Sequence, residues 1–446
     1  MPESKHFRKK EPKVKEVIIR EKSGGDYYDN IDEDKARELH PHRYEARHAP
    51  NREIIHEGNH DILRIYEEPK FRKALPYIIV LSVLVILGVS VLMMNRSHMT
   101  AQDLWARIKV SFVGSGIGDG FPVDLNGSGV EPGDFISSGG KVVTLSSTSL
   151  TELNITGKEL FSIRHNYVSP LMCENDEKFL IYDCGGTNYM TVDSSGNAEK
   201  RSSENTILSG AVASNGRYAL TTFPIGYSSQ VEIFEKNGKL KYSYKFSDDY
   251  ANAVCFNEAG DMVAVAAMYS RLGEIYTRIV IIRFDSEKPV AEYIFTGNMV
   301  QEIYWSGKYI YVIGDEAVAI GTEKGNFTEY SYGSKRITAT HVGDGKCFVS
   351  VSGYEFAGAS SLLIFSGTGE PLRLEFAYRI ESISSYGNVC AVLADHTVFT
   401  YNTNNGELRG STDAGSDSIA CALQSNNTAF ILAGKEIRYN QVKSAK

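Results

Sequence analysis

The sequence predicts an all-β protein, a β-propeller of about eight four-stranded blades outside the membrane, held by one transmembrane helix. Three observations predict it: a charge-free apolar run, eight similar strand-forming segments at regular spacing, and a spare strand ahead of the first segment. The 446 residues are 42% hydrophobic and include 26 Tyr and 20 Phe. That composition is typical of a folded, aromatic-rich β protein.

Residues 1–73 are predicted to be a polar cytoplasmic tail that is mostly disordered. They hold 17 Lys and Arg, 16 Asp and Glu, and six of the ten His. Large apolar residues are too sparse in this segment to offset the entropy of an ordered chain. The stretch from Arg52 to Tyr66 could form a transient helix leading to the membrane.

One catalytic pattern occurs in the tail, since His56-Glu57-Gly58-Asn59-His60 matches H-E-x-x-H. In a metalloprotease this motif lies on a helix, where the two His hold zinc and the Glu activates water. Gly58 and Asn59 weaken that helix, and the apolar run begins only 14 residues later. We therefore interpret the match as incidental and predict no metal, no cofactor and no catalytic residue.

Residues 74–94 form the predicted transmembrane helix, ALPYIIVLSVLVILGVSVLMM, with no formal charge. At about 1.5 Å per residue the helix is roughly 31 Å long, which matches a hydrocarbon core. Lys70, Arg72 and Lys73 precede it, whereas Arg96 stands alone after it. This asymmetry places the N-terminus in the cytoplasm and the C-terminal bulk outside the cell membrane. A cleaved signal peptide would be shorter, nearer the start and followed by small residues.

Residues 95–120 connect the predicted span to the propeller. Thr100 resembles a helix cap, which indicates a short helix through Val110. The glycine-rich segment 114–120 lacks the Lys and the following helix of a phosphate-binding loop. It is interpreted as a flexible linker or as the tight start of a strand.

The propeller is predicted at residues 121–441 from an internal repeat. Eight segments share a turn residue, a polar residue and then an apolar strand. They are KVVTLSS (from Lys141), KFLIYDC (Lys178), RYALTTF (Arg217), DMVAVAAM (Asp261), KYIYVIG (Lys308), KCFVSVSG (Lys346), NVCAVLA (Asn388) and TAFILAG (Thr428). Their starts are 37 to 47 residues apart with a mean of 41, close to the roughly 40–50 residues of a four-stranded blade. Seven blades remain an alternative if one segment is misassigned.

The two ends of the repeat region predict how the ring closes. The last unit lacks room for its final strand, because only VKSAK follows Gln441. Conversely, FPVDLNG, residues 121–127, is a spare strand before the first unit. We expect this strand to complete the eighth blade, since closure protects sheet edges that would otherwise invite aggregation.

Charge and cysteine content restrict the function. Residues 74–446 carry 30 basic and 39 acidic side chains, which argues against nucleic acid as a partner. The six Cys fall in different repeats and form no C-x-x-C. Small buried core residues are the favoured interpretation, although the outer compartment permits disulfides inside or between neighbouring blades.

Aromatic residues in three long connections are the candidate binding site. In a propeller, the connections between the second and third strands of every blade lie on one face. Three of them are long here: FPIGYSSQ, MYSRLGEIYTR and GYEFAGASS. They carry Phe223 and the predicted partner-binding residues Tyr227, Tyr269, Tyr276, Tyr354 and Phe356. Aromatic residues on loops of a rigid scaffold are typical anchors for partners, but they can also fold back and cap the core.

The charged tail, the single span and the motif GDGFPVDL, residues 118–125, resemble an uncharacterised family. Its members are membrane-anchored, WD40-like propeller proteins of Firmicutes, especially clostridia. The resemblance covers roughly residues 75–446 and implies a bacterial cell membrane, but it implies no catalytic residue. The Trp-Asp and Gly-His pairs of true WD40 repeats are absent.

Two functions follow as hypotheses. The favoured one is a non-catalytic, extracytoplasmic binding or scaffolding module for a protein or a cell-envelope glycan. The alternative is a cell-surface glycan-active enzyme, a hydrolase or lyase, with paired carboxylates about 5–10 Å apart at the propeller channel.

Overall fold

A computed structural model describes residues 118–125, 129–175, 178–353 and 358–445, together with the backbone of 14–21, 52–57 and 60–66. The chain divides into two units, Met1–Ser97 and His98–Lys446. The predicted span at residues 74–94 and the predicted helix after Thr100 lie outside the described residues. Within the described residues, no helix is long and apolar enough to cross a bilayer.

Three strands lie in the first unit, where the sequence predicted mostly disorder. They are β1 (Val14–Glu21), β2 (Arg52–Glu57) and β3 (His60–Tyr66), antiparallel and in the order β1-β3-β2. The prediction of a transient helix between Arg52 and Tyr66 is therefore wrong. Each of the three strands contains two isoleucines, and isoleucine favours strands because it is β-branched. Since Glu57 pairs with His60, the H-E-x-x-H pattern spans a hairpin turn and lacks its helix.

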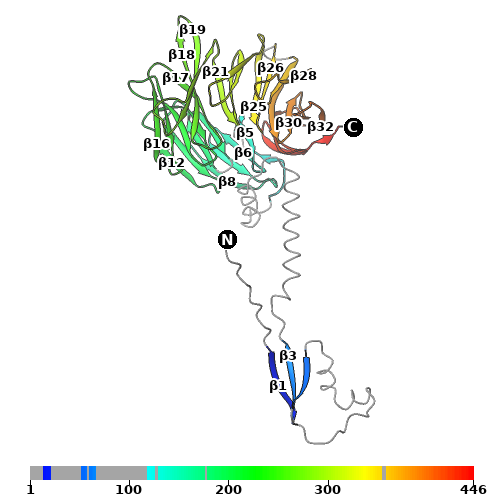
Figure 1. Ribbon diagram of the computed structural model, residues 1–446. Coiled ribbons are helices and arrows are strands. Elements are labelled where there is room, and N and C mark those ends of the chain that lie inside the picture. Colours follow the sequence, from blue (N-terminus) through cyan, green and yellow to red (C-terminus); the bar gives the residue numbers. More distant parts are fainter. Residues whose placement is uncertain are drawn as a thin grey trace. The chain divides into compact units, whose positions relative to one another are not determined.

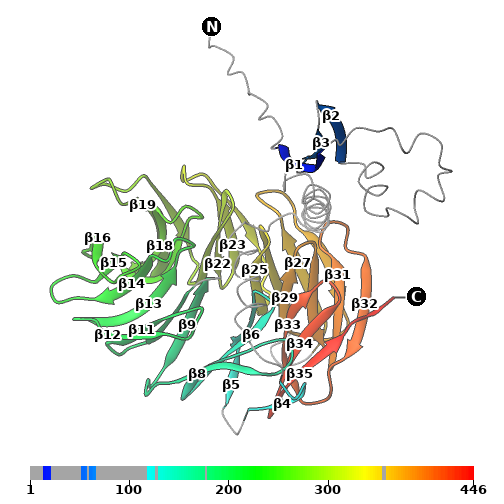
Figure 2. The same ribbon diagram turned by 90° about the horizontal axis from the view of Figure 1, so that it is seen from below.

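The described part of the second unit is an eight-bladed propeller, as predicted (Figure 1 and Figure 2). Each blade is an antiparallel sheet, and the blades follow the chain order. Blade 1 consists of β5 (Val130–Ser138), β6 (Lys141–Ser146), β7 (Ser149–Leu153) and β8 (Glu159–Arg164), and blade 2 of β9 (Pro170–Asn175), β10 (Lys178–Asp183), β11 (Asn188–Asp193) and β12 (Ala198–Ser202). Blade 3 consists of β13 (Thr206–Val212), β14 (Tyr218–Phe223), β15 (Ser229–Phe234) and β16 (Leu240–Phe246), and blade 4 of β17 (Tyr250–Phe256), β18 (Met262–Arg271), β19 (Glu274–Arg283) and β20 (Ala291–Thr296).

Blades 5 to 8 continue the same pattern around the ring. Blade 5 consists of β21 (Val300–Ser306), β22 (Tyr309–Gly314), β23 (Ala317–Gly321) and β24 (Phe327–Ser331), and blade 6 of β25 (Arg336–Gly343), β26 (Lys346–Ser352), β27 (Ser360–Phe365) and β28 (Leu372–Phe376). Blade 7 consists of β29 (Ile380–Tyr386), β30 (Val389–Ala394), β31 (Thr397–Asn402) and β32 (Leu408–Asp413). Blade 8 consists of β33 (Ser418–Ser425), β34 (Thr428–Ala433) and β35 (Glu436–Gln441), and its fourth strand is β4 (Val123–Asp124).

The eight repeated apolar segments are the second strands of the blades. Every residue of β10, β26 and β30 is buried, because sheets from neighbouring blades cover both of their faces. A strand buried on both faces reads as a continuous apolar run, which is the pattern that the sequence shows. The first strand of each blade is the inner one, and it lies beside the inner strands of the adjacent blades.

The ring closes as the sequence predicted. In blade 8, β4 pairs with β35 through Asp124 opposite Glu436 and Val123 opposite Ile437, and Figure 2 shows cyan β4 beside red β35. The ring centroid of Phe121 lies 5.6 Å from those of Phe430 and Tyr439. The N-terminal strand thus completes both the hydrogen bonding and the core of the last blade.

The chain reaches β4 through a tight backbone passage. The Gly118 backbone nitrogen donates to Thr156 Oγ1 at 2.9 Å. A Cβ atom at Gly118 would clash with the backbone nitrogen of Lys158, so a larger residue does not fit. Of the two interpretations of the glycine-rich segment, the tight start of a strand holds for residues 118–120.

The residues after β35 add a feature that the sequence did not predict. β36 (Lys443–Ser444) pairs with β32 through Ser444 opposite Gly410, so blade 7 gains a fifth strand. The pairing covers part of the outer edge of that blade.

Candidate functional site

The alternation of antiparallel strands defines two faces of the propeller. We call face A the end that carries the connections between second and third strands and between successive blades. In blades 3 and 4 these are residues 224–228, 247–249 and 272–273. Face B is the opposite end, with the connections between first and second and between third and fourth strands, for example residues 257–261 and 322–326. Of the predicted binding residues, Tyr227, Tyr269 and Tyr276 belong to face A.

Tyr227 is placed by the structure on the surface of face A, as predicted. It lies in the connection between β14 and β15, and 42% of its surface is exposed. The Lys245 ammonium lies 4.7 Å from the centroid of its ring. This cation–π contact orients the ring.

Tyr269 and Tyr276 lie in strands, which corrects the expectation that their segment is a loop. β18 and β19 continue to a two-residue turn, and Tyr269 pairs with Tyr276 across the hairpin. The two rings stack with centroids 5.2 Å apart, and both side chains are half-buried. Cross-strand aromatic pairs stabilise such a hairpin, so part of each ring is used inside the molecule. Tyr354 and Phe356 lie outside the described residues.

The tip of this hairpin has an unusual residue. Leu272 and Gly273 form the turn, with φ values of +54° and +85°. Turns with two positive φ values favour Asn-Gly, because a bulky side chain is strained there. Leu272 is nonetheless a leucine, and it is 97% exposed. An apolar side chain held in a strained conformation and in water indicates a function other than folding.

More exposed apolar residues lie at the face A end of blades 3 and 4. We define the apolar patch as Phe223, Ile225, Tyr227, Tyr250, Leu272 and Ile275, whose side chains are between 42% and 99% exposed. Phe223 of blade 3 stacks on Tyr250 of blade 4 with ring centroids 6.2 Å apart, so the patch crosses the boundary between the blades. Ile225, at 99%, is the most exposed of the six.

Sequence reasoning found Phe223 and Tyr227 but missed Ile225, Tyr250, Leu272 and Ile275. A signal was present, because Ile225 and Leu272 are aliphatic residues beside Gly226 and Gly273 in turns that are ordinarily polar. The stacking of Tyr250 on Phe223 depends on the packing of two blades and has no local signal.

The first strands of the blades carry carboxylates that bear on the enzymatic alternative. On β5, burial and the nearby Glu131 raise the pKa of Asp134 to about 6. On β21, Glu302 accepts a hydrogen bond from Thr340 Oγ1 at 2.9 Å, and burial raises the pKa of Glu302. A carboxylic acid with a raised pKa beside a second carboxylate is what a glycan-active enzyme would use, so Asp134 and Glu131 carry that alternative.

The cysteines form no disulfide, and Cys255, Cys347, Cys390 and Cys421 are buried as predicted. Cys173 and Cys184 are half-buried. Burial raises the pKa of all six thiols, which disfavours the thiolate and so opposes nucleophilic chemistry. Among the residues that the structure describes, no cluster of His, Cys, Asp and Glu could hold a metal ion.

Comparison with known proteins then gives the family. The family of unknown function DUF5711 matches residues 126–438, most of the propeller. The chain belongs to this family. The expectation of an uncharacterised propeller family is thereby supported, while bacterial origin and membrane anchoring stay predictions. No curated protein matches the sequence of this family member.

Three solved structures are similar to this family member at low identity. The computationally designed Ika8 protein is 14% identical, with a TM-score of 0.52, covering 71% of this chain and 98% of its own. The C-terminal WD40 domain of Sif2 is 12% identical, with a TM-score of 0.48 and coverages of 73% and 99%. Hydrazine synthase of Kuenenia stuttgartiensis is 11% identical, with a TM-score of 0.43 and coverages of 74% and 100%. At 14% identity the similarity to the Ika8 protein concerns the fold alone.

Proposed function

We propose that the protein is a non-catalytic binding module that is anchored in a bacterial cell membrane and engages a protein partner outside the cytoplasm. The apolar patch on face A carries the proposal. Monomeric proteins rarely gather exposed aliphatic and aromatic side chains in this way unless a partner covers them. Propellers offer such patches on a rigid ring, so little conformational entropy is lost on binding.

The chemistry of the patch favours a protein over a glycan on this face. Ile225 and Leu272 present aliphatic carbon with no hydroxyl or amide to bond a sugar. Phe223 and Tyr227 add aromatic surface, the residue class that dominates protein interfaces. The partner should therefore present a complementary apolar surface with few charges at its centre.

A crosslinking experiment in intact cells of the source organism tests this proposal. A photoreactive phenylalanine replaces Ile225 in the full-length chain, and a second chain carries it at Ile155, exposed on face B. We expect a discrete crosslinked partner at Ile225 and none at Ile155. Equal products at both positions, or no product at Ile225, would contradict the proposal.

A hairpin replacement provides the matched variant. Tyr269 pairs with Tyr276 in the same hydrogen-bonding phase as the pair that closes the native turn, so Asn-Gly can replace Ser270–Ile275 and close the hairpin with a favoured turn. The variant should keep its melting temperature within a few degrees while losing at least about tenfold in crosslinking yield. Substituting Val290 of face B with Ser should change neither quantity. A hairpin variant that crosslinks as well as the unaltered chain would show that Leu272 and Ile275 do not contact the partner.

A further inference from the structure

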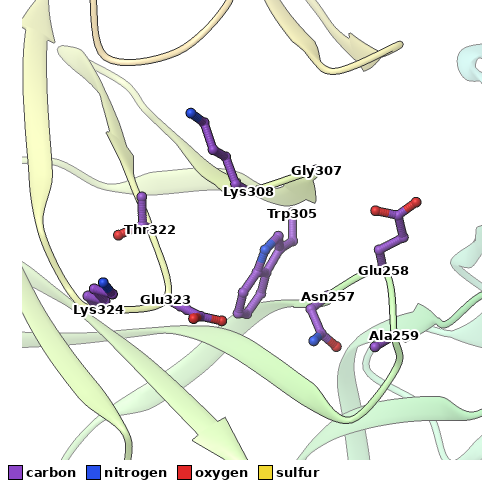
Figure 3. Close-up of a pocket in the computed structure, with 9 residues that line it drawn as sticks. All are labelled: Asn257, Glu258, Ala259, Trp305, Gly307, Lys308, Thr322, Glu323 and Lys324. Carbon is purple, nitrogen blue, oxygen red and sulfur yellow. The ribbon is translucent and has the colours of Figure 1, made fainter. Parts of the chain in front are cut away.

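A pocket lies on face B between blades 4 and 5, away from the apolar patch. Its volume is about 680 Å³, within the range of about 300–1,000 Å³ of small-molecule sites. The β17–β18 turn supplies Asn257, Glu258 and Ala259, the β21–β22 hairpin supplies Trp305, Gly307 and Lys308, and the β23–β24 turn supplies Thr322, Glu323 and Lys324. Figure 3 shows the indole of Trp305 between the Glu258 and Glu323 turns.

Trp305 forms a fixed aromatic surface in this pocket. It is one of two tryptophans in the sequence. Its backbone pairs with Ile310, and its side chain packs against the core cluster that contains Ile310 and Val312. Packing on the core holds the ring in place before any ligand arrives, which lowers the entropy lost on binding.

The turns beside Trp305 are also held. Asn257 Oδ1 accepts the backbone N–H groups of Asp261 and Met262 at 3.1 and 3.0 Å. The Gly325 N–H donates to the Thr322 carbonyl at 2.9 Å. The side chains of Glu258 and Glu323 are therefore presented from rigid turns on the two sides of the indole.

Several polar side chains of the pocket make no hydrogen bond or ion pair within the part of the chain that the structure describes. Glu258, Glu323 and Lys324 make no hydrogen bond or ion pair through their side chains among the residues that the structure describes, and neither does the Thr322 hydroxyl. Lys308 contacts the ring of Tyr309, with its ammonium 4.9 Å from the centroid, and in Figure 3 it points away from the indole. The pocket thus offers acceptors, donors and one aromatic face.

These groups select one ligand class. The ammonium groups of Lys308 and Lys324 offset the charge of the carboxylates of Glu258 and Glu323, so the lining has no net charge and favours a ligand without net charge. A pyranose ring has an apolar C–H face that stacks on an indole and hydroxyl groups that bond carboxylate, ammonium and hydroxyl groups. We infer that the pocket around Trp305 binds a neutral saccharide. This inference does not depend on the proposed protein partner, because the two sites lie on opposite faces.

Tryptophan fluorescence provides a direct test with the full-length chain in detergent. Trp105→Phe leaves Trp305 as the single tryptophan. The probes are maltotetraose, cellotetraose and tetra-N-acetylchitotetraose, with ATP as the anionic comparison. At least one tetrasaccharide should shift the emission of Trp305 saturably below about 10 mM, and ATP should not. If no tetrasaccharide shifts the emission at that concentration, or if ATP binds as well as they do, the inference is wrong.

A pair of matched double variants locates the binding site. Glu258→Ala with Glu323→Ala removes two carboxylates from the pocket, whereas Glu159→Ala with Glu287→Ala removes two exposed ones elsewhere on face B. Calorimetry should show affinity reduced about tenfold for the first pair and unchanged for the second. Circular dichroism verifies that both fold. Equal affinities would overturn the assignment, and neither pair alters the apolar patch, so crosslinking at Ile225 remains an independent result.

Discussion

At the scale of single residues, His341 links blades 6 and 7 by a hydrogen bond that requires its imidazole to be neutral. It lies on β25, and the backbone N–H of Ser385 on β29 donates to its Nε2 atom at 3.1 Å. An accepting Nε2 carries no proton, so the imidazole is neutral. Burial lowers the pKa of His341 to about 4 against the influence of Asp344, in agreement with this hydrogen bond.

The stability of the protein should therefore depend on His341 in mildly acidic solution. The unfolded chain protonates this residue below its ordinary pKa of 6.5, but the folded chain does so only below about 4. The unfolded state binds the proton first, so the free energy of unfolding should fall as pH drops between these values, by up to about 3 kcal/mol. Urea unfolding from pH 7.5 to 4 measures this.

His341→Gln provides the comparison, because its amide oxygen can accept the same hydrogen bond and does not titrate. The variant should lose less stability over that pH range than the unaltered chain. Identical pH profiles would show that the imidazole is not neutral and buried in the native state.

At the scale of elements, ring closure depends on a strand of two residues. β4 has only two pairs with β35, too few to hold the ring by backbone hydrogen bonds alone. Phe121 and Val123 add side-chain packing against the core of blade 8, where Phe430, Leu432 and Ile437 are buried. We infer that apolar packing stabilises the closure more than the ladder does.

Phe121→Ala should accordingly destabilise the propeller. Loss of its contacts with Phe430 and Tyr439 should lower the free energy of unfolding by about 2–4 kcal/mol, near the lower end for large-to-small changes because the ring is only half-buried. Phe223→Ala, which removes an exposed ring, should cost less than about 1 kcal/mol. Chemical denaturation of both variants decides the matter, and equal losses would mean that Phe121 does not close the ring.

At the scale of the whole molecule, the proposed orientation across the membrane can be tested by labelling cysteines. Every native cysteine lies between residues 173 and 421 and is buried or half-buried. Ser4→Cys marks the tail, and Glu287→Cys marks an exposed site on the propeller. An impermeant maleimide should label Glu287→Cys in intact cells and Ser4→Cys only after lysis. The reverse pattern would invert the orientation, and labelling of both in intact cells would contradict a cytoplasmic tail.

Much of the propeller was readable from the sequence because its signals are local. Central strands such as β10 and β30 are buried on both sides and read as apolar runs at a regular spacing. The spare strand at residues 121–127 identified the closing blade. The site was less predictable, since Tyr269 and Tyr276 share a hairpin in which they stack on each other.

The sequence by itself predicted about eight blades, the order of their strands and the way in which the ring closes, because burial leaves a pattern on every central strand. Only the tertiary structure decided which surfaces could bind. The stacking of Phe223 on Tyr250 and the position of Trp305 between Glu258 and Glu323 join residues of different strands or blades. Such neighbours are far apart along the chain, and no local periodicity encodes their proximity.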